Sequence, residues 1–208
     1  MSQSSEKAFE TLLLEMAQLF ELEQQELGHE EAGETASVLR EAAGKTEPIL
    51  AKPYDYDHLV EKTLASAQHP CAVAARDSMP FIQWENTAGI LDEYIPDAVS
   101  SAFAGNQLMG PGSLIDHPSL RAGLYFQCAN SYYALHHHEA VETYIMIDGT
   151  GDWTQGDVTT SYGVEGLIHH TSFMPHAFRT FDKPLMAIWR WSGNIDPSTY
   201  KMLPDENG

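Results

Sequence analysis

Six of the ten histidines in this 208-residue chain lie between residues 136 and 176. On an extended strand alternate side chains share a face, so His136 and His138 point one way and His137 the other. Glu142 follows four residues after His138. A tight turn over residues 139–141 would return Glu142 on an adjacent strand, where it would face the two imidazoles. Two nitrogens and one carboxylate oxygen form an open metal site with positions left for water or substrate.

A fourth ligand must come from elsewhere in the chain, and His176 supplies one 34 residues after Glu142. His169 and His170 lie upstream on an expected strand. A hydrogen-bonded barrel histidine is the favoured interpretation of both, and a role in orienting a ligand is the alternative. The sequence therefore predicts one divalent ion, Zn²⁺, Mn²⁺ or Fe²⁺, held by His136, His138, Glu142 and His176.

Tyr144 is the candidate for acid–base chemistry, because it stands two residues after Glu142 and on the same face of the strand. A phenol beside a divalent cation loses its proton well below its reference pKa of about 10. A tyrosinate of this kind is a capable general base for a weakly acidic carbon. The alternative is a tyrosine that only packs in the interior.

The two halves of the chain predict different secondary structure. In residues 1–109 apolar residues recur at helical spacing, which predicts helices over 6–27, 31–43, 57–67 and 96–105, with one strand over 80–84. In residues 110–208 short β-branched and aromatic runs alternate with Gly, Asp, Asn and Pro. These runs predict strands over 120–128, 132–138, 142–147, 151–154, 166–170 and 185–191. We expect one β sandwich or barrel with the helices on its outside, or else a separate helical subdomain.

Composition narrows the classes of partner. Eleven Lys and Arg against 30 Asp and Glu give a formal net charge of −19, which argues against nucleic-acid binding. Cys71 and Cys128 match no metal or redox spacing and are expected to be free thiols. The N-terminus has no leader pattern and no long apolar run, so we expect a cytoplasmic, soluble protein without membrane contact.

The run from His136 to Gly149 reads H-x-H-x3-E-x6-G and resembles the first cupin motif. The second cupin motif is represented in degenerate form by Gly163 or Gly166, Pro175 and His176. Asn130 stands where the family usually has a glycine, and the glycine between the proline and the histidine is missing. The resemblance covers roughly residues 112–192. It implies a mainly β fold, the double-stranded β-helix or jelly-roll barrel, with an α-helical N-terminal extension.

A narrower resemblance rests on E-T-Y after H-x-H and on the strand A-I-W-R-W after the distal histidine. These residues resemble the cupin-type dimethylsulfoniopropionate lyases, and the DddL-type branch most. The resemblance implies a carbon–sulfur lyase that splits a small zwitterionic sulfonium substrate into dimethyl sulfide and acrylate. In that family the metal binds the substrate carboxylate and a tyrosine, here Tyr144, removes the α-proton.

The sulfonium group requires aromatic faces that tolerate positive charge. Tyr133 and Trp191 are the better matches to the family's pocket aromatics, whereas strand alternation favours Tyr132, which is in phase with His136. A bulge beside Tyr133 would decide between them and would also set His136 back from the metal.

Two other functions fit the same residues. A three-histidine, one-glutamate site suits a different cupin enzyme such as an Fe²⁺ dioxygenase. A cupin that binds a ligand without catalysis is the third interpretation, although the sequence offers it no basic face or DNA-binding module. The helical N-terminus is expected to support a homodimer, to cover the barrel mouth, or both.

Overall fold

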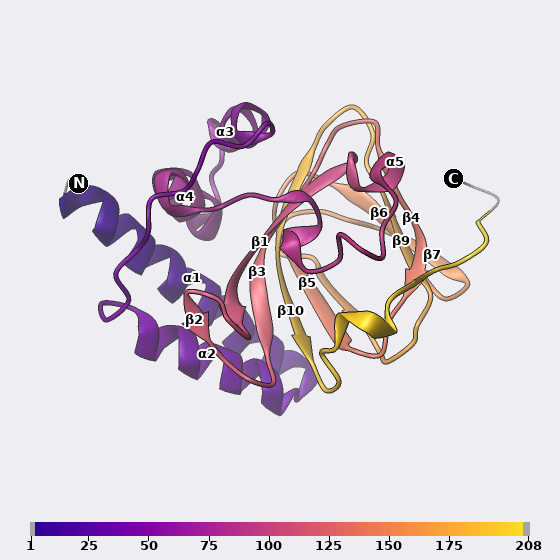
Figure 1. The fold of residues 1–208 in the computed structure, drawn as a ribbon, viewed down its shortest axis with the longest axis horizontal. Coiled ribbons are helices and arrows are strands. Elements are labelled where there is room, and N and C mark those ends of the chain that lie inside the picture. The colour runs from indigo at the N-terminus through magenta and orange to yellow at the C-terminus, as the bar shows by residue number, and fades with distance from the viewer. Residues whose placement is uncertain (1–2, 206–208) are drawn as a thin grey trace.

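The computed structural model describes residues 3–205, with side chains from Lys7 onward, and it consists of helices packed on one side of a two-sheet barrel (Figure 1). One sheet has six strands in the order β2-β1-β3-β10-β5-β8, and the other has five in the order β11-β4-β9-β6-β7. This arrangement confirms the predicted mainly β fold with N-terminal helices. The strands are β1 (Phe103–Gly110), β2 (Ile115–Asp116), β3 (Arg121–Gln127), β4 (Tyr132–His137), β5 (Val141–Asp148), β6 (Gly151–Gln155), β7 (Val158–Tyr162), β8 (Leu167–His170), β9 (His176–Arg179), β10 (Leu185–Ser192) and β11 (Lys201–Met202).

The first four helices precede the sheets in the chain and pack on the outer face of the six-stranded sheet, whereas the short fifth helix lies against β4 of the other sheet (Figure 1). Phe9, Leu12, Met16 and Phe20 form a fully buried stripe on α1, at the three- and four-residue spacing of one helix face. Each such side chain contributes about 1.5–3 kcal/mol of burial free energy. The helices are α1 (Gln3–Leu27), α2 (Glu30–Ala42), α3 (Asp57–Leu64), α4 (Pro70–Asp77) and α5 (Asp97–Ser100), with 3₁₀ turns η1 (Met79–Phe81), η2 (Asn86–Gly89) and η3 (Pro197–Thr199).

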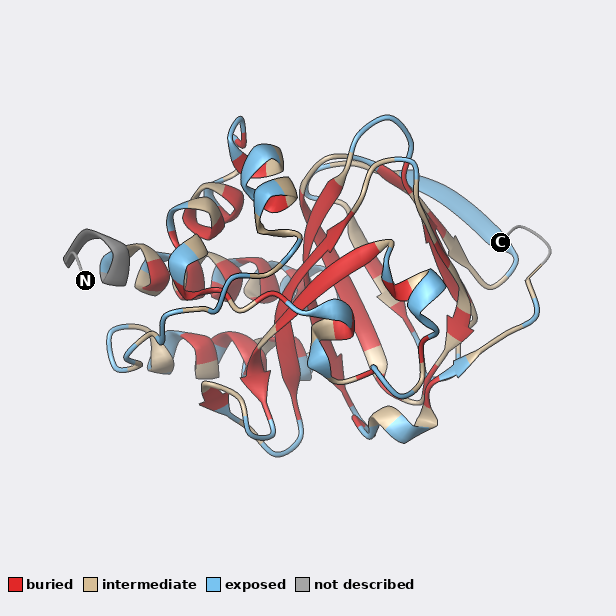
Figure 2. Cartoon of the chain, turned by 45° about the horizontal axis from the view of Figure 1, so that its top comes forward, coloured by how far each residue is buried: buried red, intermediate tan, exposed pale blue. Residues whose placement is uncertain are grey.

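The six-stranded sheet is buried on both faces, which divides the interior into two cores (Figure 2). In β3, Leu124 and Phe126 belong to the core under the helices, whereas Tyr125 belongs to the core inside the barrel. All eight residues of β10 are buried for the same reason. Because of this two-sided burial, residues of the helices contact the outer face of the same strands whose inner face lines the barrel interior.

The N-terminal half differs from its predicted structure in two places. The helix expected over 96–105 ends at Ser100, and β1 begins at Phe103, so the sheet starts before the expected domain boundary at residues 109 and 110. Residues 79–81 form a 3₁₀ turn, and no strand is assigned over 80–84. The sequence F-A-G-N-Q-L-M-G of β1 lacks the apolar–polar alternation of a half-exposed strand, because β1 is buried on both faces.

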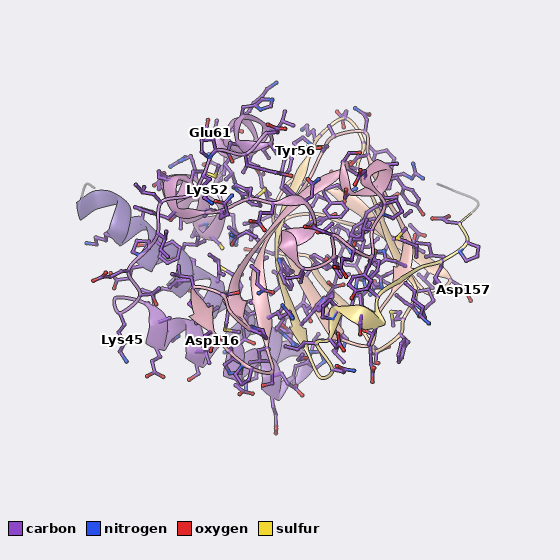
Figure 3. The ribbon with its side chains drawn as sticks, viewed as in Figure 1. Lys45, Lys52, Tyr56, Glu61, Asp116 and Asp157 are labelled. Atoms are coloured by element: carbon purple, nitrogen blue, oxygen red, sulfur yellow. The ribbon has the colours of Figure 1, made fainter. Side chains whose placement is uncertain are left out.

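Exposed charged side chains surround the fold, including the labelled Lys45, Lys52, Glu61, Asp116 and Asp157 (Figure 3). Cys71 and Cys128 are both free thiols, the first buried and the second half-buried. Among residues 3–205, no helix combines the length and the apolar character required to cross a membrane.

Gly123 marks a place where two strands approach unusually closely. A Cβ built on Gly123 would lie 1.7 Å from the backbone oxygen of Asn106 on β1, next to the register shift between Gln107 and Met109. Backbone atoms cannot move aside as a flexible side chain does, so only glycine fits here. Gly163, by contrast, has no atom closer than 3.7 Å to such a Cβ.

We therefore expect Gly123→Ala to destabilise the β1–β3 pair. Overpacking of this kind costs about 1–3 kcal/mol, which lowers the thermal unfolding midpoint of a chain of this size by roughly 2–12 °C. Gly163→Ala is the matched control and should leave the midpoint unchanged. Equal midpoints for Gly123→Ala and the wild type, measured by circular dichroism, would show that β1 and β3 have room for a methyl group at this position.

Candidate metal centre and active site

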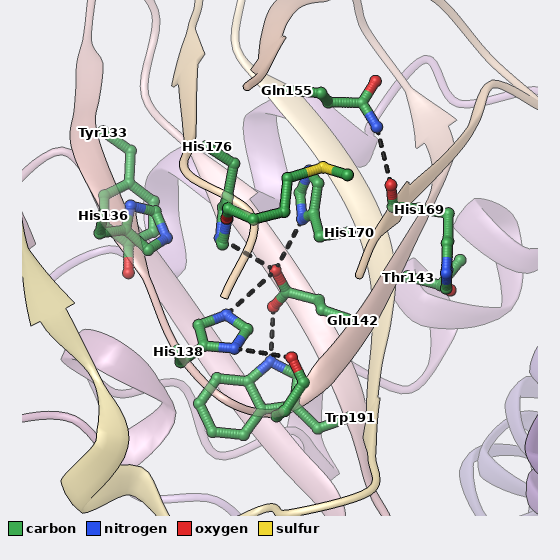
Figure 4. Close-up of polar contacts among 12 residues, drawn as sticks. Tyr133, His136, His138, Glu142, Thr143, Gln155, His169, His170, His176 and Trp191 are labelled. Carbon is green, nitrogen blue, oxygen red and sulfur yellow. Dashed lines mark hydrogen bonds and ion pairs between the residues drawn. The ribbon is translucent and has the colours of Figure 1, made fainter. Parts of the chain in front are cut away.

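The predicted metal ligands come from both sheets and meet inside the barrel (Figure 4). His136 lies on β4 opposite His176 on β9, in the five-stranded sheet, and His138 follows the end of β4. Glu142 lies on β5 in the six-stranded sheet, between Trp191 on β10 and His170 on β8. The expectation that a turn returns Glu142 on a strand paired with β4 is therefore wrong. The chain crosses from one sheet to the other after His138, and the side chains meet across the barrel.

Backbone carbonyls fix the orientation of three of these imidazoles. The Nδ1 atoms of His136, His138 and His176 lie 2.8, 3.0 and 2.7 Å from the carbonyl oxygens of Ala134, Ala140 and Met174. A carbonyl can only accept, so each Nδ1 carries the proton and each Nε2 presents a lone pair. The same side chains satisfy the spacing of a metal site, because their ligand atoms lie within 4.8 Å of one another.

Glu142 is the buried charge at the centre of the site, with 2% of its surface exposed. Its Oε2 atom lies 3.5 Å from His138 Nε2, 3.3 Å from His176 Nε2 and 3.0 Å from His170 Nδ1. Its Oε1 atom accepts a hydrogen bond of 2.6 Å from the indole nitrogen of Trp191. Burial opposes its ionisation, but the surrounding imidazoles outweigh that effect and hold the pKa of Glu142 well below its usual range.

Burial holds His136, His170 and His176 in the neutral form. Burial, followed by the neighbouring His176, lowers the pKa of His136 well below its ordinary value and that of His170 to about 3. Burial also lowers the pKa of His176. Neutral imidazoles are the form that binds metal ions, so these groups need not lose a proton at pH 7 to act as ligands.

Unpaired nitrogen atoms in the cluster indicate that its residues suit a divalent cation. Within the described part of the chain, Nε2 of His138, His170 and His176 is buried and has no hydrogen-bond partner. An unpaired buried polar atom costs free energy, and the Nε2 atoms of His138 and His176 lie 3.5 and 3.3 Å from Glu142 Oε2, an arrangement that a cation between them satisfies. His136, His138, Glu142 and His176 offer the mixed nitrogen and oxygen donors that Zn²⁺, Mn²⁺ and Fe²⁺ accept.

His170 belongs to this site, although its sequence context favoured an ordinary barrel histidine. It is fully buried, its ring stacks on that of His176 with centroids 4.0 Å apart, and its Nδ1 contacts Glu142. His169 points to the opposite face of the sheet, where it contacts Thr143. His137 lies outside the cluster, as expected, with its ring 5.4 Å from that of Phe173. The two-residue period predicts that His169 and His170 face opposite ways, but not which of them faces inward.

A register shift in β4 resolves the conflict between Tyr132 and Tyr133. The pairing of β4 with β9 shifts between Tyr133 and His136, and this irregularity brings their rings into a stack with centroids 4.2 Å apart. Tyr132 instead donates a hydrogen bond to Asp205 and lies under the guanidinium of Arg179. The placement of Tyr132 in the site by simple alternation is therefore wrong. His136 nevertheless remains in the cluster despite the irregularity.

A pocket lined mainly by aromatic side chains opens beside the cluster. Tyr144 lies in it on the same strand face as Glu142, and burial, followed by the charge of Glu142, raises its pKa well above the usual value. Segment 87–91, in the predicted helical half, forms part of the wall and was not foreseen, because it has neither helical nor strand periodicity. The aromatic lining comprises Phe103, Tyr125, Tyr133, Tyr144, Trp189, Trp191 and Tyr200.

Two facing sheets that enclose a histidine–glutamate cluster define a cupin. A dimethylsulfoniopropionate lyase family profile matches residues 31–187, and the chain belongs to that family. The dimethylsulfoniopropionate lyase DddQ of Ruegeria pomeroyi is 32% identical over 104 residues, which are 50% of this chain and 52% of that protein. The alignment thus spans about half the length of that relative.

Solved structures agree on the fold. A crystal structure from work on the lyases RdDddP and RnDddQII matches with a TM-score of 0.70 and 18% identity, covering 97% of this chain and 100% of that one. The crystal structure of DddQ from Ruegeria pomeroyi matches with a TM-score of 0.61 and 23% identity, covering 93% and 98%. The curated relative and the second of these structures are DddQ proteins, and the expected resemblance to the DddL-type branch stays a prediction.

Metal binding is testable with two neighbouring histidines. His138→Ala removes a group aimed at Glu142 and should weaken Zn²⁺ binding by more than about 100-fold, since even the outer partners of a ligand contribute 10–100-fold. His137→Ala is the matched control and should retain full metal content. Elemental analysis after dialysis against Zn²⁺ measures both, and equal metal content in the two variants would contradict this ligand assignment.

Proposed function

We propose that this protein cleaves dimethylsulfoniopropionate into dimethyl sulfide and acrylate by β-elimination. The observation that carries the proposal is the convergence of a buried His/Glu cluster, a tyrosine and an aromatic pocket within a member of this lyase family. Each part of the substrate finds a complementary group. The carboxylate faces the metal centre, the α-carbon faces a base, and the sulfonium faces aromatic rings.

His136, His138, Glu142 and His176 are proposed to hold one divalent cation. When bound, that cation supplies positive charge that lowers the pKa of a nearby phenol and stabilises the negative charge developing on the substrate. His170 keeps Glu142 in place through its contact with Oε2, and Trp191 does the same through Oε1. Both oxygens of the carboxylate therefore have a protein partner that limits its rotation.

Tyr144 is proposed as the general base. Tyr144 lines the pocket beside the carboxylate of Glu142, whereas Tyr125 donates to Gln127 at 2.9 Å and Tyr200 donates to Tyr133 at 3.0 Å. The phenolate oxygen of Tyr144 takes the α-proton, and the electron pair of that C–H bond forms the double bond of acrylate. The bond between the β-carbon and sulfur breaks, and its electron pair leaves with neutral dimethyl sulfide. A neutral thioether leaves readily, so no strong general acid is required.

Tyr133 and Trp191 are proposed to hold the dimethylsulfonium group. Both are buried and line the pocket, Tyr133 stacked on His136 and Trp191 beside His138 with ring centroids 4.4 Å apart. Aromatic faces attract a weakly hydrated cation through the ring quadrupole, as they do quaternary ammonium groups.

The direct test is to give the metal-loaded protein dimethylsulfoniopropionate and to measure dimethyl sulfide in the headspace together with acrylate in solution. Equal amounts of the two products are expected. Neither product from a fully metallated sample would refute the proposed reaction.

Tyr144→Phe tests the base without removing the ring. Loss of a general base lowers turnover by about 100- to 10,000-fold, so kcat should fall by that factor while metal content is unchanged. Tyr162→Phe is the matched control, because its hydroxyl contacts Gln155 outside the pocket and its loss should leave kcat unchanged. A Tyr144→Phe enzyme with wild-type kcat would place the base on another residue.

A further inference from the structure

A second polar cluster lies on the opposite face of the strands that carry the metal centre. Glu23 of α1 is fully buried and reaches the outer face of the six-stranded sheet, where Arg190 of β10 is also fully buried. Arg190 donates from Nε to Glu23 Oε2 at 2.8 Å and from Nη2 to Oε1. Thr143 of β5 donates to Glu23 Oε1 at 2.7 Å, and His29 Nδ1 lies 2.9 Å from the same oxygen.

The cluster extends to a third strand. His169 of β8 contacts the hydroxyl of Thr143 at 3.1 Å. Because the Thr143 proton is used toward Glu23, His169 Nδ1 donates and the hydroxyl accepts. Glu23, His29 and His169 also lie close enough to suggest a cation site. Arg190 and Thr143 already donate to the Glu23 oxygens, however. We therefore interpret the cluster as a network of hydrogen bonds and ion pairs within the chain rather than as a metal site.

The register places this outer cluster directly behind the metal centre. Arg190, Thr143 and His169 pair across β10, β5 and β8 in one row of the sheet. The next residues along the same strands, Trp191, Glu142 and His170, pair in the adjacent row and point into the barrel. One buried carboxylate from the helical extension therefore fixes three strands one residue away from Glu142 and its two hydrogen-bond partners.

We infer that Glu23 is a positioning residue, which, through Thr143 and Arg190, holds Glu142 and Trp191 in the geometry that the metal centre requires. This inference rests on the proposed metal site and gives the N-terminal helix a role in the chemistry besides covering the sheet. Displacement of a reacting or ligating group by about 1 Å can cost 100-fold in rate, so a constraint on three strands at this row has a measurable effect.

Thr143→Val is the most specific test. Glu23→Gln would leave the buried charge of Arg190 uncompensated and threatens the fold itself. Thr143→Val keeps the shape and the Glu23–Arg190 pair and removes the hydroxyl that links Glu23 to β5 and, through His169, to β8. Thr143→Ser restores the hydroxyl and serves as the conservative rescue. Thr35→Val is the matched control, since Thr35 is fully buried in α2 and its hydroxyl donates to the Glu31 carbonyl of the same helix.

Two readouts separate positioning from stability. The first is the indole N–H resonance of Trp191 in the metal-free protein, assigned with Trp191→Phe, which reports the bond to Glu142. The second is Zn²⁺ affinity by titration calorimetry. Thr143→Val should shift the resonance and weaken Zn²⁺ binding about tenfold, the lower end of the effect of partners of ligating groups. Thr143→Ser should restore both, and Thr35→Val should change neither, although it lowers the unfolding midpoint.

A Thr143→Val protein with the wild-type resonance and wild-type Zn²⁺ affinity would overturn the inference. The same follows if Thr35→Val alters both readouts as much as Thr143→Val does, because the effect would then come from stability alone. Failure of the wild type to produce dimethyl sulfide would refute the proposed reaction instead. Failure to bind Zn²⁺ would refute the metal site, and the Trp191 resonance would still decide the role of Glu23.

Discussion

The burial of the Glu142 charge is the constraint on which the rest of the structure depends. An ionised carboxylate inside a protein is strongly unfavourable unless charged or hydrogen-bonding partners surround it. Here Trp191 donates to one oxygen, while His138, His170 and His176 converge on the other. The unpaired Nε2 atoms of those three histidines show that protein contacts alone do not complete the cluster. We propose that a divalent cation completes it, which would make the site a metal centre rather than a buried hydrogen-bond network.

The burial of both faces of the six-stranded sheet is consistent with the need to keep the Glu142 carboxylate away from water. Its inner face must hold Glu142 and the aromatic pocket, and its outer face is covered by helices that exclude water from behind. Because side chains alternate along a strand, Thr143 and Arg190 necessarily face the helices when Glu142 and Trp191 face the pocket. The buried pair of Arg190 with Glu23 thus joins the two halves of the chain at the row next to the metal centre.

The sequence predicted which residues come together in the site better than it predicted which strands and sheets carry them. The H-x-H-x3-E spacing identified His138 and Glu142, which the structure brings together, but local spacing does not determine which sheet a strand joins. The register shift beside Tyr133 depends on pairing with β9, a strand that the sequence did not predict. His170 was not predicted as a site residue, because the sequence does not show which of two adjacent histidines faces the barrel interior. Asn130 stands where the family usually has a glycine and adopts a left-handed φ of 53°, a conformation in which Asn is enriched among the non-glycine residues.

The measurement that tests the central claim most directly is anomalous diffraction from crystals of the protein loaded with Zn²⁺. We expect one strong peak per chain, within bonding distance of a carboxylate oxygen of Glu142 and of Nε2 of His136, His138 and His176. A peak on the outer face of the sheet, or a fully loaded crystal in which Glu142 and the histidines bind no ion, would contradict the assignment of this buried cluster as the metal centre.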